Sequence, residues 1–127
     1  MRTIKLAMEL IYAGIEQGGG TFTSNGDKVT AKTGYVVGGK RKSLVMRLPH
    51  DKGIIAATER AAEWLDKGMQ VLYYGSWVDG DILYIDAVDI IQSRATAVHV
   101  GKLRGEEAIW DLAEGKEVRL EEQEEEA

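Results

Sequence analysis

The dipeptide Asp79-Gly80 is the strongest local constraint on how this chain can fold. It separates two long apolar runs, residues 69–78 and 81–91. An Asp-Gly pair between such runs is typical of a two-residue β-hairpin turn, because glycine readily adopts the positive φ that the turn requires. Both runs are apolar on both faces, so we expect this hairpin at the centre of a sheet, with Tyr73 opposite Asp86.

Three helices are predicted around this hairpin. Apolar residues recur at helical spacing in residues 1–17 and 54–66, and glycine follows each segment. Ser93 is a suitable N-cap for a third helix over residues 94–104.

Further turn signals predict additional hairpins. The turns are Asn25-Gly26 between residues 21–23 and 28–37, Gly-Gly-Lys-Arg-Lys (38–42) between residues 36–37 and 43–48, and Glu114-Gly115 between residues 108–112 and 117–120. The resulting order is helix then hairpin, three times, with an extra strand after the first. It predicts an α+β fold, a mainly antiparallel sheet built of three hairpins with about three helices packed on one face.

Length and composition predict one domain. The chain has 127 residues, enough for a single core, and no cysteine. We assign residues 1–120 to one α+β domain. Five of the last seven residues are Glu, so residues 121–127 are predicted to form a disordered acidic tail. Charged residues interrupt the apolar N-terminus, so no signal peptide or membrane span is expected, and the predicted location is the cytoplasm.

Charge is sorted along the chain rather than mixed. Residues 28–50 contain six basic residues and no acid, whereas residues 51–92 contain eight acids and three bases. Such sorting favours electrostatic contact with a partner, a second copy of the chain or a polyanion. The candidate binding residues are the basic side chains of the first block with one aromatic side chain for stacking: Lys28, Lys32, Tyr35, Lys40, Arg41, Lys42 and Arg47.

No motif in the sequence predicts catalysis, a metal site or a cofactor. Gly34 and Gly39-Lys40 resemble a phosphate-binding loop, but Arg41 stands where Ser or Thr must hold magnesium. Two polar residues are candidates for a functional role. Asp86 interrupts an apolar strand, where it would bond a tyrosine such as Tyr73 or a backbone amide, and His50 stands at a chain break where it could orient a ligand.

Five segments of the second half stand out as a set: Gly75-Ser76-Trp77-Val78-Asp79, Leu83-Tyr84-Ile85-Asp86, Ser93-Arg94-Ala95, Arg104-Gly105-Glu106 and Ala108-Ile109-Trp110-Asp111-Leu112, with Gly115. In these segments the chain resembles small uncharacterised proteins encoded by phages of actinobacteria. The resemblance implies a phage setting, in the cytoplasm of the host, and no particular reaction.

These observations predict a non-enzymatic accessory protein that binds a host or phage macromolecule, a candidate for host takeover or for countering host defence. A host or phage protein is the expected partner. One alternative is a nucleic-acid-binding protein that uses the basic hairpin 36–47, and another is a structural component of the virion. Self-association through the opposed charge blocks is left open.

Overall fold

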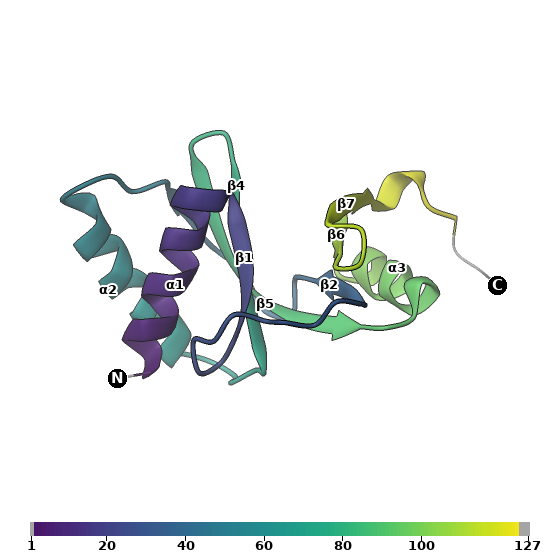
Figure 1. Cartoon of the computed structure of the whole chain (residues 1–127), viewed down its shortest axis with the longest axis horizontal. Coiled ribbons are helices and arrows are strands. Elements are labelled where there is room, and N and C mark those ends of the chain that lie inside the picture. The colour runs from purple at the N-terminus through teal and green to yellow at the C-terminus, as the bar shows by residue number, and fades with distance from the viewer. Residues whose placement is uncertain (1, 125–127) are drawn as a thin grey trace.

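The structure is a computed structural model that describes residues 2–124, and it has the predicted α+β class (Figure 1). Within these residues, seven strands form one antiparallel sheet. The helices are α1 (Arg2–Gln17), α2 (Gly53–Asp66) and α3 (Arg94–Leu103). The strands are β1 (Gly19–Thr23), β2 (Tyr35–Val37), β3 (Leu44–Arg47), β4 (Tyr73–Asp79), β5 (Ile82–Ile91), β6 (Ala108–Asp111) and β7 (Lys116–Arg119).

Strand β5 is the element that joins the two halves of the molecule. One of its edges pairs with β4 from Ile82 to Val88, and the other pairs first with β3 and then, from Asp89 to Ile91, with β2. Strand β1 extends the first half beyond β4, while β6 and β7 extend the second half beyond β2. Figure 1 shows the two halves on opposite sides of β5.

All three helices pack on the same face of the sheet. In β5, the side chains of Leu83, Ile85 and Ala87 enter the core formed with α1 and α2, and Ile91, which has the same parity, packs on the core under α3. Because side chains alternate along a strand, residues of the opposite parity are left on a face without helices. The expectation of helices on one face is therefore confirmed.

The helices begin and end close to the predicted positions. Ser93 caps α3 as expected, since its Oγ accepts a hydrogen bond from the Thr96 amide at 3.2 Å. None of the helices in residues 2–124 is long and apolar enough to cross a membrane.

The prediction that residues 36–47 form a basic hairpin is wrong. Strands β2 and β3 do not pair with each other; both run antiparallel to β5 along the same edge. Residues 38–43 leave that edge and return to it, and the Gly39 amide donates to Asp86 Oδ2 at 2.9 Å while the Lys40 amide donates to the Ala87 carbonyl at 3.2 Å. The glycines permit a local excursion from the strand edge rather than a reversal of the chain.

Two other hairpin predictions need correction. The Asp79-Gly80 hairpin forms as β4 and β5, but Asp79 pairs with Ile82, so the register is two residues from the expected one and Asp86 lies opposite Gly75 rather than Tyr73. The turn at Asn25-Gly26 is followed by a single bridge from Lys28 to Phe22, and β1 takes β4 as its strand partner. Only β4–β5 and β6–β7 are hairpins of the predicted kind.

The beginning of the predicted tail is described by the structure. Leu120 is buried and starts one turn of 3-10 helix that ends at Glu122, and Lys102 Nζ donates to the Gln123 carbonyl. Residues 125–127 lie outside the described part of the chain, so the disorder of the whole tail stays a prediction.

Candidate functional site

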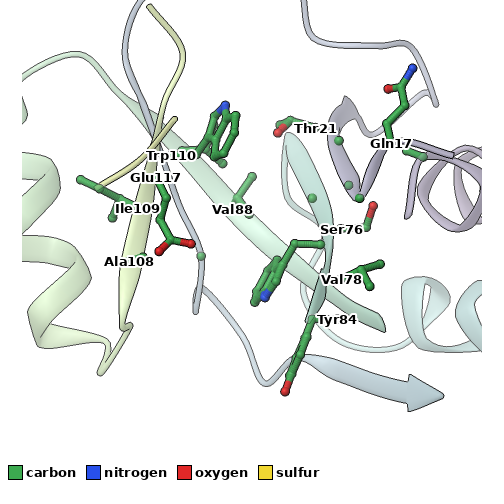
Figure 2. A pocket seen from close by; sticks show the side chains of 18 of the residues that line it. Gln17, Thr21, Ser76, Val78, Tyr84, Val88, Ala108, Ile109, Trp110 and Glu117 are labelled. Atoms are coloured by element: carbon green, nitrogen blue, oxygen red, sulfur yellow. The ribbon is translucent and has the colours of Figure 1, made fainter. Parts of the chain in front are cut away.

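An open cleft of about 1050 Å³ lies on the face of the sheet without helices, and residues of α1 between Glu9 and Gln17 also line it. Strand β5 forms its floor, with Val88 at the centre. Figure 2 shows Thr21 of β1 and Val78 of β4 on one side of the floor, and Trp110 of β6 and Glu117 of β7 on the other. The cleft therefore lies between the two halves that β5 connects.

Large aromatic side chains line this cleft and remain partly exposed. Trp77 stacks on Tyr84, its cross-strand partner, with ring centroids 5.2 Å apart and the planes 9° from parallel. Trp110 on the opposite wall is 45% exposed, and Trp77 is 37% exposed. Exposed aromatic side chains that gather in one hollow are typical of contact surfaces, so this pair favours the cleft as a binding surface.

The charged residues around the cleft are mostly acidic. Two cations, Lys28 and Arg119, are among the lining residues, and Arg119 is already paired with Glu117 at 3.3 Å. Six carboxylates line the same cleft: Glu9, Glu16, Asp79, Glu106, Glu107 and Glu117. Their field attracts cations and repels polyanions.

Two carboxyl groups converge on Gly38 at the floor of the cleft. A Cβ placed on Gly38 would lie 2.3 Å from Asp86 Oδ2 and 2.5 Å from Glu106 Oε1. No side chain fits there, so glycine is required for the approach of these two carboxyls. Asp86 is fully buried, and its Oδ1 has no hydrogen-bond partner among residues 2–124, while Glu106 is half-buried and lines the cleft.

The surroundings of these carboxyls favour their protonated forms. Burial raises the pKa of Asp86, and the hydrogen bond from the Gly39 amide opposes part of that rise. Burial, followed by the nearby charge of Asp86, raises the pKa of Glu106 to about 7, although Arg104 acts in the opposite direction. One of the two groups is thus poised to change its protonation state near neutral pH.

The neighbouring carboxylate of Asp89 forms ion pairs with the two nearby cations, Lys40 and Arg104. Asp89 Oδ1 lies 2.9 Å from Lys40 Nζ, and its Oδ2 lies 2.7 Å from Arg104 Nη2. Burial alone would raise the pKa of Asp89, but the hydrogen bonds from these two cations outweigh it and lower the pKa. Arg104 Nη1 is also directed to the carbonyl of Gly38, at 3.2 Å.

Several residues of the predicted basic surface are engaged within the fold instead. Lys40 pairs with Asp89, and Arg41 lies over the ring of Trp64 with its Cζ 3.9 Å from the ring centroid. Arg47 is exposed and lies 3.5 Å from Asp81. The block of positive charge therefore does not form one continuous surface.

The remaining candidates lie apart from one another. Tyr35 is half-buried in β2, with the guanidinium of Arg94 5.7 Å from its ring centroid. Asp86 accepts a hydrogen bond from the backbone amide of Gly39 and not from Tyr73. A backbone amide was one of the two partners that the sequence predicted. The other candidates are exposed: Lys28, Lys32, Lys42 and His50. Of these four residues, Lys28 alone lines the cleft.

Sequence reasoning missed the residues that define the cleft. Glu106 follows a helix and carries no motif, and its proximity to Asp86 depends on the route of residues 38–43. Trp77 lies opposite Tyr84, and Trp110 lies opposite Glu117, but no pattern in the sequence indicated that these two tryptophans line the same cleft. Among residues 2–124, no three His, Cys, Asp or Glu side chains are placed to hold a metal ion.

Comparisons with protein-family models, with curated proteins and with solved structures gave no significant match for this chain. The resemblance to actinobacterial phage proteins therefore stays a prediction.

Proposed function

We propose that this protein is a non-enzymatic binding protein whose cleft takes up an extended, arginine-containing segment of a partner protein. The observation that carries the proposal is the combination of two partly exposed tryptophans with an excess of carboxylates in one cleft. A phage setting, with a host or phage protein as the partner, is the context that the sequence resemblance suggests.

Charge complementarity supports a cationic ligand. Six carboxyl groups line the cleft against Lys28 and Arg119, and the pairing of Arg119 with Glu117 leaves five carboxyl groups against one lysine. A basic segment would be drawn to this surface, and wrong partners of negative charge would be repelled. Such attraction is screened by salt, because the Debye length is about 8 Å at physiological ionic strength.

The aromatic side chains favour arginine over lysine. A guanidinium is planar and weakly hydrated, so it can stack on an aromatic face while donating hydrogen bonds in its own plane to a carboxylate. Trp77 with Tyr84 and Trp110 offer aromatic surface on both walls, and carboxylates lie on the same walls. An open cleft between strands suits an extended chain better than a compact ligand.

Nucleic acid binding has less support as an alternative. Lys40 and Arg41 make internal contacts, so the strongest part of the basic block does not form a free cationic surface. The aromatic side chains that could stack on bases lie instead among carboxylates, which repel phosphates.

Binding of a short synthetic peptide in which arginine and serine alternate tests the proposal by titration calorimetry. Trp110→Ala should weaken binding about tenfold or more, since a central aromatic side chain commonly dominates an interface. Leu72→Ala is the matched control, because Leu72 is 72% exposed and does not line the cleft. Equal effects of the two substitutions would contradict the proposal.

A second pair of probes separates charge from shape. Replacing each arginine of the peptide by citrulline keeps the shape and removes the charge, and binding should be lost. A single-stranded oligonucleotide should not bind to the cleft. If it binds and Lys42→Glu abolishes that binding while Trp110→Ala does not, the nucleic-acid alternative replaces the present proposal.

A further inference from the structure

In the part of the chain that the structure describes, no lysine or arginine forms an ion pair with the carboxyls of Asp86 and Glu106, although the charge of Arg104 lowers the pKa of both. Both contact the position that a Cβ on Gly38 would occupy, so Asp86 Oδ2 and Glu106 Oε1 lie within about 5 Å of each other, close enough for each charge to disfavour the other. The cations of this region, Lys40 and Arg104, bind Asp89 instead.

An unpaired buried oxygen lies behind the cleft at this point. Asp86 is fully buried, and none of the described residues forms a hydrogen bond with its Oδ1. The other oxygen, Oδ2, accepts from the Gly39 amide at 2.9 Å. A buried carboxylate oxygen without a hydrogen bond is costly, and a proton or a cation close by reduces that cost. A positive charge at the floor of the cleft, beside Asp86 and Glu106, would therefore stabilise these two carboxyls.

We infer that Asp86 and Glu106 together hold one proton in the free protein and release it when a guanidinium of the bound segment binds beside Glu106. The inference rests on the proposed function and assigns to the cleft a subsite for one arginine side chain. Glu106 lines the cleft and contacts the ligand, whereas Asp86, behind it, acts on the ligand through Glu106.

The proton balance follows from the charges that face the pair. Burial and the charge of Asp86 raise the pKa of Glu106 to about 7, with Glu107 adding to the rise and Arg104 opposing it. A guanidinium next to Glu106 stabilises the ionised form, so the carboxyl proton passes to the solvent as the ligand binds. Ligand binding and deprotonation are then linked, and affinity rises with pH.

Titration calorimetry with the arginine-serine peptide, repeated in buffers of different ionisation enthalpy, measures this proton release directly. Close to pH 6 the wild-type protein should release a proton on binding, and affinity should rise about tenfold between pH 6 and pH 8. Glu106→Gln should remove both the proton release and the pH dependence. Asp79→Asn is the matched control, because Asp79 also lines the cleft and is not among the groups that shift the pKa of Glu106; it should lower affinity and keep the pH dependence.

The outcomes separate this inference from the proposed function. Peptide binding to the wild-type protein without proton release and with constant affinity overturns the shared-proton subsite and leaves the proposed function standing. Absence of peptide binding at every pH overturns both. A second measurement needs no variant: the side-chain carboxyl carbon of Glu106, followed by NMR, should titrate near neutral pH in the free protein and at lower pH in the complex. An unchanged midpoint on peptide binding contradicts the inference.

Discussion

The guanidinium of Arg41 lies over the ring of Trp64, with its Cζ 3.9 Å from the ring centroid, and its Nη2 donates to the Trp64 carbonyl at 2.8 Å. The indole Nε1 of Trp64 in turn donates to the Lys42 carbonyl at 3.3 Å. These contacts attach residues 38–43 to helix α2 and help to hold this segment beside β5, where Gly38 meets the two carboxyls.

Replacing Arg41 by alanine should therefore reduce stability rather than partner binding. A partly buried cation–π contact and its hydrogen bond together contribute about 1 to 2 kcal/mol to the free energy of unfolding. Lys42→Ala is the matched control, because Lys42 is the exposed neighbour in the same segment, and it should change stability by less than about 0.5 kcal/mol. Urea denaturation measures both. Equal effects would contradict the structural role of Arg41.

Gly38→Ala should destabilise the protein by about 1 to 3 kcal/mol, because the added methyl group overlaps the carboxyl oxygens of Asp86 and Glu106. Gly53→Ala is the control, since its added Cβ would have only ordinary contact, at 3.9 Å from Pro49, and alanine is the better helix former at the start of α2. Thermal unfolding of the two variants gives the comparison. A fully stable Gly38→Ala protein would show that the two carboxyls do not converge as described.

The stability of the free protein should depend on pH through Glu106. Its pKa is about 7 in the folded protein and near the ordinary 4.5 in the unfolded chain. Between these values the folded state binds more protons, so the contribution of Glu106 to stability is fully present below about pH 4.5 and is lost as pH rises towards 7. Glu106→Gln should flatten this part of the profile of unfolding free energy against pH. An unchanged slope would contradict the raised pKa.

Ser76→Ala should cost about 1 kcal/mol of unfolding free energy, because the buried Ser76 Oγ donates to the Leu10 carbonyl at 2.8 Å and joins β4 to α1. Thr30→Ala provides a comparison, since Thr30 is exposed in the connection between β1 and β2. Chemical denaturation should show no appreciable loss for the second variant. A loss as large as that of Ser76→Ala would mean that the buried hydrogen bond is not the cause.

Local sequence patterns predicted the helices and two of the hairpins well, because those features depend on neighbouring residues. The cap at Ser93 and the turns at Gly80 and Gly115 are such features. The pairing of β2 and β3 with β5 depends on contacts between distant segments. A Gly-Gly-Lys-Arg-Lys sequence is compatible with both a hairpin tip and an excursion from a strand edge, so the pattern alone could not separate them.

The candidate site was harder to predict from the sequence, because it also depends on contacts between distant segments. Asp86 could be singled out because it interrupts an apolar run, but its neighbour Glu106 is brought close only by the tertiary fold. The charge of residues 28–50 suggested a basic surface, yet Lys40 and Arg41 have partners within the fold. Sorted charge along a chain does not reveal which charges remain free after folding.

The chain has three tryptophans, and they supply an internal control for the central claim. Trp77 and Trp110 line the cleft, whereas Trp64 packs under Arg41 outside it. The most direct measurement is an NMR titration of the three indole N–H resonances of ¹⁵N-labelled protein with the arginine-serine peptide. The cleft model predicts that the signals of Trp77 and Trp110 shift and that the Trp64 signal does not. Shifts confined to Trp64, or no shift with a peptide that binds by calorimetry, would contradict it.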